Sequence, residues 1–308
     1  MKRISETALL VAMYRALETD RSDAIIHDRY ARRLAGDRGR MAVEVLGDQP
    51  QAIDAIAVRT WAIDDQLLRL IQAESIDTVI NLASGLDTRP YRLNLPPELR
   101  WIEVDLPEIL THKAQILQFE TPNCRLEQFA LDITDRDQRN QFLYKIDSST
   151  HNGIILTEGL LSYLTESEVI SLSTSFHECI NIPWWITEVI SGRAKKEMHQ
   201  AFNHQLFNDY FFDGEEAVHF APQLGVNFFE LHQWQIVEFR ACIVELMRFN
   251  RGNRSTRFLQ KILSRWAPSY WQKLCRSAGI ALLHKPDVRD RQSNRETTSD
   301  ANFTRHAN

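Results

Sequence analysis

The sequence has few cysteines, and their spacing excludes the usual metal-binding patterns. The 308 residues include four of them, at Cys124, Cys179, Cys242 and Cys275. A zinc site brings its cysteines within a few positions of one another, whereas the closest pair here, 242 and 275, is 33 positions apart. We therefore interpret all four as free thiols of a cytoplasmic protein, and we expect no metal site.

A basic excess and long apolar runs are also missing. The net charge is -5 and the isoelectric point is near 6.1, whereas nucleic-acid binding normally needs a basic face. No apolar run approaches the roughly 20 residues that a membrane span requires. The short run at residues 8–14 is followed by Arg15, which favours an amphipathic helix over a secretory signal. We expect a small-molecule partner, no nucleic acid and no membrane; the oligomeric state stays open.

The chain opens with helical periodicity and then changes character. Apolar residues recur every three or four positions from Ile4 to Leu17, and again from Ile53 to Ile71, with a charged segment at residues 29–40 between them. From Asp77 onward, short β-branched runs alternate with helical stretches, which is typical of a doubly wound, mostly parallel α/β sheet. The expected strands are residues 78–82, 101–105, 126–131, 154–157, 184–189, 235–244 and 280–284.

Some boundaries can also be predicted. Thr165 and Glu168 form a capping-box pattern, so a helix should begin there and run to about Cys179. We expect one domain over residues 1–285, with a helical part at 1–75 and an α/β core at 76–285 that carries an insertion near 193–234. Residues 286–308 are charged and polar, which predicts a disordered tail.

The loop after the first expected strand is the most informative segment. It reads NLASGLDTR over residues 81–89 and follows the carboxyl end of a strand, where open α/β sheets bind ligands. Gly85 lets the backbone pass close to a ligand because it has no Cβ. A dinucleotide needs several glycines and a free helix N-terminus for its pyrophosphate, whereas Asp87 would repel phosphate. S-adenosylmethionine has no phosphate and carries a sulfonium cation, so the loop favours this methyl donor.

Two later strand ends supply acidic residues that suit a nucleoside. Asp105 ends the strand at residues 101–105 and can accept hydrogen bonds from both ribose hydroxyls. Asp132 follows the next strand, where its carboxylate can meet the adenine amino group while Ile133 covers the ring. As an alternative, Asp132 is only a helix-start residue that shares a capping role with Thr134 or Asp135.

Five segments resemble, in order and spacing, the leucine carboxyl methyltransferase-like family. They are Arg59-Thr60, GLDTRPYR at residues 85–92, EVDLP at 103–107, DITD at 132–135 and TEGLLSYL at 157–164. The likeness extends over roughly residues 5 to 245 and is strongest to the bacterial branch of small-molecule O-methyltransferases. It implies a Rossmann-like class I methyltransferase fold, an N-terminal helical lid over residues 1–75, and S-adenosylmethionine as cofactor.

The resemblance also implies roles for single residues. Arg59 would hold the carboxylate of the donor, and Gly85 would lie beside its methionine part. Asp105 would take the ribose, and Asp132 with Ile133 would take the adenine. The family commonly has a glycine where Ala83 stands, in a two-glycine loop, so Ala83 is expected to tighten the donor pocket slightly.

The fourth strand ends near two further candidates. Glu158 would line the donor pocket near the amino group or the sulfonium, and Tyr163 either packs in the core or points into the acceptor pocket. We treat both as candidate catalytic residues. Arg59 can alternatively be a solvated helix residue, and Arg89 with Arg92 can lock nearby carboxylates such as Asp87.

The sequence says least about the chemical identity of the methyl acceptor. A carboxylate acceptor is already ionised at neutral pH because its pKa is about 4, whereas a hydroxyl acceptor needs a base. The sequence shows no obvious base, which favours a carboxylate or an acidic phenol of a small metabolite. Alternatives are the C-terminal carboxylate of a protein, or a non-catalytic interaction module that keeps the fold. A nucleotide-dependent oxidoreductase is disfavoured by the loop at residues 81–89.

Overall fold

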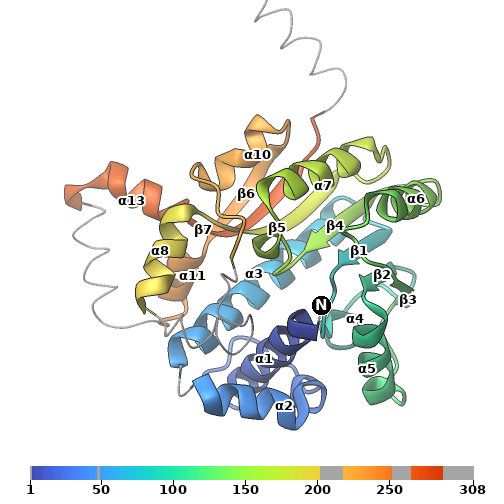
Figure 1. Cartoon of the computed structure of the whole chain (residues 1–308), viewed down its shortest axis with the longest axis horizontal. Helices are drawn as coiled ribbons and strands as arrows, with labels where there is room; N and C mark the ends of the chain where they lie inside the picture. Colours follow the sequence, from blue (N-terminus) through green and yellow to red (C-terminus); the bar gives the residue numbers. More distant parts are fainter. Residues whose placement is uncertain (1, 47–48, 202–217, 252–264, 287–308) are drawn as a thin grey trace, which may run out of the picture.

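The computed structural model describes residues 2–46, 49–201, 218–251 and 265–286 (Figure 1). Part of the expected insertion, residues 202–217, lies outside the described residues, and so does the expected tail from residue 287 onward. No helix among the described residues is long and apolar enough to cross a membrane.

A seven-stranded sheet in the order β3-β2-β1-β4-β5-β7-β6 forms the centre of the described structure. Its strands are β1 (Thr78–Leu82), β2 (Arg100–Asp105), β3 (Arg125–Ala130), β4 (Gly153–Thr157), β5 (Trp184–Ile190), β6 (Gln235–Ala241) and β7 (Ala278–His284). The pairings among β1 to β5 are parallel, whereas β7 runs antiparallel to both β5 and β6. The predicted mostly parallel α/β sheet is therefore confirmed, and each expected strand has its counterpart.

One expected boundary is wrong. The strand predicted at residues 235–244 ends at Ala241, and helix α11 (Cys242–Arg248) follows directly. Ala241 pairs with Gly279, one residue after the start of β7, so almost no partner strand remains for the residues beyond it. The β-branched pair Ile243-Val244 suggested a longer strand, but without ladder partners the backbone bonds of this segment close within a helix.

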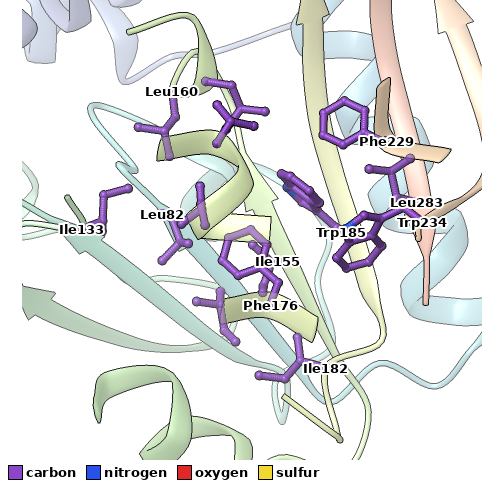
Figure 2. Close-up of a cluster of buried hydrophobic side chains, with 14 of the residues drawn as sticks. Leu82, Ile133, Ile155, Leu160, Phe176, Ile182, Trp185, Phe229, Trp234 and Leu283 are labelled. Atoms are coloured by element: carbon purple, nitrogen blue, oxygen red, sulfur yellow. The ribbon is translucent and has the colours of Figure 1, made fainter. Parts of the chain in front are cut away.

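Helices cover both faces of the sheet, as a doubly wound fold requires. In β1, Ile80 and Leu82 belong to one buried cluster and Val79 to another, because successive strand residues point to opposite faces. The first cluster packs against α6 (Arg136–Asp147), α7 (Glu166–Glu178) and α10 (Phe228–Leu231), and the second packs against α3 (Pro50–Ala73). Figure 2 shows the first cluster, where Trp185 lies beside Phe229 and Trp234.

The predicted capping box is present at the start of α7. The Thr165 side chain accepts from the backbone N–H of Glu168, and the Glu168 carboxylate accepts from the backbone N–H of Thr165. The helix ends at Glu178 with Cys179 as its C-cap, as expected. Apart from the two N-terminal helices, the other described elements are α4 (Arg89–Arg92), α5 (Pro107–Leu117), η1 (Leu161–Tyr163), α8 (Gly192–Ala201), η2 (Gly225–Asn227) and α13 (Pro268–Cys275).

The N-terminal helices gather beside the loop that follows β1. Helix α1 (Lys2–Thr19) packs against α2 (Ala31–Leu46) and also contacts α3 (Figure 1). The charged segment at residues 29–40 falls mostly within α2. Apolar residues of α1 and α2 share a buried cluster with Leu86 of the loop and Ile109 of α5. The helical part expected over residues 1–75 is thus attached to the sheet at its first loop.

A residue from late in the chain holds α1 in place. Arg251, just after α11, is 3% exposed and donates from Nη2 to Oε1 of Glu18 at 2.8 Å. The same nitrogen donates to the carbonyl oxygen of Asp23 at 2.7 Å. Glu18 and Arg251 are 233 positions apart in sequence, so this contact fastens the first helix to the final third of the chain.

Candidate functional site

A cavity of about 390 Å³ lies where β1, β2, β3 and β4 end and α1 covers them. In this sheet order, β1 sits between β2 and β4, so the chain crosses in opposite directions on its two sides and opens a crevice there. All the residues singled out from the sequence line this one cavity: Arg59, Ala83, Gly85, Asp105, Asp132, Ile133, Glu158 and Tyr163. Residues from five separate segments of the chain are thereby brought together.

The loop after β1 makes a sharp turn into the cavity. Ala83 and Gly85 both have a positive φ, 52° and 53°, in the left-handed region that favours glycine. The turn brings the backbone N–H of Gly85 within 2.6 Å of Asp105 Oδ2, while Asp105 Oδ1 accepts from the N–H of Leu106 at 2.7 Å. Burial raises the pKa of Asp105, although these two N–H donors oppose the shift. The ends of β1 and β2 are therefore joined by one carboxylate.

The segment after β3 presents a second carboxylate. Asp132 Oδ1 accepts from the N–H and the hydroxyl of Thr134, at 3.0 and 2.7 Å, and within the described ranges Oδ2 carries no hydrogen bond. The N-cap of α6 is Asp135, which accepts from two helical N–H groups. Asp132 is thus not the N-cap itself, and its Oδ1 closes the turn at Thr134 that precedes the helix. Ile133 is buried at the border of the first core cluster (Figure 2) and also lines the cavity.

An arginine on α4 ties the cavity wall together. Arg89 is 1% exposed, and its Nε donates to Asp64 at 2.6 Å. Its Nη1 donates to Asp87 at 3.0 Å and to Glu158 at 2.7 Å. Burial alone would raise the pKa of Asp87, but Arg89 and its basic neighbours hold that pKa well below its ordinary value. The predicted lock of Arg89 on Asp87 is confirmed, and Arg92 adds bonds to Asp64.

Arg59 is engaged rather than solvated. It reaches from α3 to Glu158 through Nε at 3.0 Å and to Glu188 of β5 through Nη1 at 3.2 Å, and its side chain is 13% exposed. The alternative of a solvated helix residue is therefore wrong. Nη2 of Arg59 carries no hydrogen bond to any residue that the structure describes. Glu188 was missed in the sequence, although an acidic residue within an otherwise apolar strand was a usable signal.

The two candidate catalytic residues sit in contrasting environments. Both oxygens of Glu158 are bound by arginine, one by Arg59 and the other by Arg89. Burial alone would raise the pKa of Glu158, but the two arginines outweigh burial and lower this pKa. Tyr163 is partly buried, its hydroxyl donates to Thr7, and burial raises its pKa. Tyr163 is therefore not a pure core residue, because it is only partly buried and lines the cavity.

Helix α1 contributes a face of the cavity, and its individual residues were not singled out from the sequence. Thr7, Ala8, Val11 and Arg15 line the cavity. Arg15 donates from Nη2 to the carbonyl of Leu86 at 2.6 Å and from Nε to Asp28 at 2.9 Å. The four-residue spacing of positions 7, 11 and 15 was the available signal, because such residues share one helix face. Within the described ranges, no cluster of three or more His, Cys, Asp or Glu side chains is arranged to hold a metal ion.

The sequence profile of the leucine carboxyl methyltransferase family matches residues 8–176, more than half of the chain. The chain belongs to this family. A protein of Saccharopolyspora erythraea named "Putative S-adenosyl-L-methionine-dependent methyltransferase" is 34% identical over 181 residues, which cover 56% of this chain and 62% of that protein. A Mycobacterium tuberculosis protein of the same name is 36% identical over 177 residues, covering 52% and 56%. The matched region thus spans about six tenths of the length of each of these curated relatives.

Solved structures resemble the fold of this family member over nearly its whole length. A DUF574 family protein from Streptomyces avermitilis aligns with a TM-score of 0.55 at 11% identity, covering 91% of this chain and 97% of that one. A Thermobifida fusca structure titled as a "putative methyltransferase" aligns with a TM-score of 0.51 at 14% identity, covering 92% and 94%. At such low identity these matches show the Rossmann-like fold and nothing finer.

The conformation of Ala83 gives a prediction about stability. Alanine in the left-handed region is strained, so Ala83→Gly should raise the free energy of unfolding by about 0.5–1 kcal/mol, net of the extra freedom of glycine in the unfolded chain. As a control, Ala57→Gly within α3 should lower it by about 1 kcal/mol or more. Urea denaturation measures both. A loss of stability in Ala83→Gly would contradict the strained geometry of the loop.

Proposed function

We propose that this chain is an S-adenosylmethionine-dependent O-methyltransferase that transfers a methyl group to a carboxylate of a small metabolite. The observation that carries the proposal is the meeting of Gly85, Asp105 and Asp132 around one cavity. Its volume of about 390 Å³ falls within the range of about 300–1,000 Å³ typical of ligand pockets. The family membership and the names of the relatives support the same activity.

The polar groups around the cavity fit this donor. Asp105 can exchange its bond to Gly85 for the ribose hydroxyls, and Asp132 Oδ2 is open to the adenine amino group. Arg59 lines the cavity, and its Nη2 can donate to the carboxylate of the methionine part. The buried hydroxyls of Thr60 and Ser84 belong to cavity-lining residues and have no hydrogen-bond partner in the described part of the chain. A polar ligand would satisfy such groups, whereas an apolar one would leave their desolvation cost in place.

The charge balance favours a cationic donor over a phosphate compound. The ion network beside the cavity contains the guanidinium groups of three arginines and four carboxylates, which leaves one negative charge in excess. Its members are Arg59, Arg89, Arg92, Asp64, Asp87, Glu158 and Glu188. Asp105 and Asp132 add to this excess nearby. A sulfonium is stabilised in such surroundings, and a pyrophosphate is repelled.

Positioning is the main task of the protein in this reaction. S-adenosylmethionine supplies an activated methyl group, and its sulfur leaves as a neutral thioether, so no acid is needed. Holding the two reactants in line can contribute on the order of 7–11 kcal/mol to catalysis. Arg89 fixes Glu158 and Asp87 on the wall, while Arg15 fixes α1 over the loop at Leu86. Glu158 and Tyr163 then act as a fixed charge and a fixed hydroxyl beside the reacting groups.

The protonation states of these two residues favour an acceptor that is already ionised. The lowered pKa of Glu158 and its two arginine partners make it a poor proton acceptor at neutral pH. The raised pKa of Tyr163 keeps its hydroxyl protonated. A carboxylate with a pKa of about 4 needs neither as a base.

The first test concerns the donor. Asp105→Asn should weaken binding of S-adenosylmethionine by about 10- to 100-fold, because hydrogen bonds to a charged acceptor contribute about 1.5–3 kcal/mol. Glu108→Gln, an exposed change in the first turn of α5, should leave affinity unchanged. Isothermal titration calorimetry measures both. Absence of binding by the unaltered chain at millimolar donor would overturn the proposed function.

The second test concerns the acceptor's pH dependence. Glu158 stays ionised and Tyr163 stays protonated across neutral pH, so the rate with a carboxylate acceptor should be flat between about pH 6 and 8.5. Initial rates at each pH with a fixed excess of donor give the profile, and circular dichroism confirms that the chain stays folded. A tenfold rise per pH unit would instead indicate a hydroxyl acceptor that loses its proton to a base.

The third test separates a metabolite from a protein acceptor. When the chain is incubated with a cell lysate and methyl-labelled donor, we expect label in the small-molecule fraction, released by mild alkali as expected of a methyl ester. Label retained by protein would instead indicate a C-terminal carboxylate. A lysate sample without the chain serves as the blank. No labelled product in either fraction would favour the non-catalytic alternative.

A further inference from the structure

Arg139 of α6 is a buried cation without a buried anion beside it. It is 4% exposed, and in the part of the chain that the structure describes it forms no ion pair. Its Nη1 donates to the carbonyl oxygen of Ile133 at 2.9 Å. Its Nη2 donates to the hydroxyls of Ser171 and Ser175 on α7, at 3.1 and 3.2 Å. Every one of these partners is neutral.

Such an arrangement is costly, so the guanidinium is expected to do something that an apolar side chain cannot. A buried charge without a counter-ion loses its hydration and gains no ion pair in return. Burial accordingly lowers the pKa of Arg139, and the nearby Arg136 adds to the effect, although Asp135 and Glu178 oppose it. The planar guanidinium contributes a fixed orientation instead, because it binds one carbonyl oxygen and two hydroxyl groups at the same time.

The carbonyl that Arg139 holds belongs to the segment at the end of the cavity where Asp132 lies. The backbone N–H of Leu131 donates to the carbonyl of Asp105 at 3.0 Å, which fixes the start of this segment. Asp132 Oδ1 is held by Thr134. The bond from Arg139 to Ile133 lies between these anchors and ties the segment to α7 through the two serines.

A second, smaller cavity marks the same place. It has a volume of about 40 Å³ and is lined by Arg139, Ser171 and Leu172. Four further lining residues, Ile133, Thr134, Leu164 and Glu168, also line the main cavity. The guanidinium therefore lies directly behind the wall that the main cavity presents at this end.

We propose that Arg139 is a positioning residue for purine recognition, which sets the placement of Ile133 and Asp132 and thereby the preference for a 6-amino purine. The inference rests on the proposed function, because it takes the base at this end to be adenine. Asp132 Oδ2 accepts a hydrogen bond from an amino group but would face the carbonyl oxygen of a 6-oxo purine. The discrimination therefore depends on how firmly the carboxylate and Ile133 are held.

The test compares two ligands that differ at this one position. S-adenosylhomocysteine carries the 6-amino group, and S-inosylhomocysteine carries a 6-oxo group instead. Calorimetric titration gives the ratio of their affinities for the unaltered chain and for each variant. Arg139→Met should lower the preference for the adenosyl ligand by about tenfold, the value of one well-placed hydrogen bond. Ser171→Ala, which removes one anchor of Arg139, should lower it by about two- to threefold.

Arg136→Met is the matched control, because it lies on the same helix but is exposed, and it should leave the ratio unchanged. A purely structural role of Arg139 would lower thermal stability while preserving the ratio, and that result overturns the inference. If Arg139→Met does not fold, Ser171→Ala decides, and an unchanged ratio there overturns it too. Failure of the unaltered chain to bind S-adenosylhomocysteine would overturn the proposed function itself.

Discussion

The structure depends on the buried guanidinium of Arg89. Its hydrogen bonds reach Asp64 on α3, Asp87 in the loop after β1 and Glu158 at the end of β4. These three elements meet at the switch point of the sheet, where nothing apolar could fix their relative positions so directionally. Removing one member of such a network leaves its partners buried and unpaired, which typically costs about 3–5 kcal/mol. The walls of the cavity and the stability of the fold are therefore maintained by the same contacts.

Much of the sheet could be predicted from the sequence, because β-branched runs and strand-end carboxylates are local signals. The residues at 85, 105 and 132 were found because parallel strands end at one edge, so their relative position follows from the fold class. The end of β6 could not be found in this way. It is determined by where β7 begins, 37 residues after the end of β6.

The contacts missed in the sequence share one physical property. Arg15 and Glu188 act on residues that are distant in the chain, and Arg139 connects the nearby Ile133 to distant serines of α7. Each of the three resembles an ordinary helix or strand residue when read locally. Their importance comes from burial combined with a specific partner, which only the packed structure shows. The departure at Ala83 is the opposite case. The glycine that the family commonly has at this position was a local signal of an unusual backbone conformation. The positive φ of Ala83 explains why glycine is common there.

The contact between Arg251 and Glu18 has a consequence for the order in which the molecule assembles. Helix α1 is among the first segments to be synthesised, yet the arginine that anchors it is made more than two hundred residues later. During synthesis the sheet can begin to form while α1 still lacks this anchor. The contact between Arg251 and α1 therefore forms only after the strands beneath the cavity have been made, whereas the bond from Arg15 to Leu86 can form earlier.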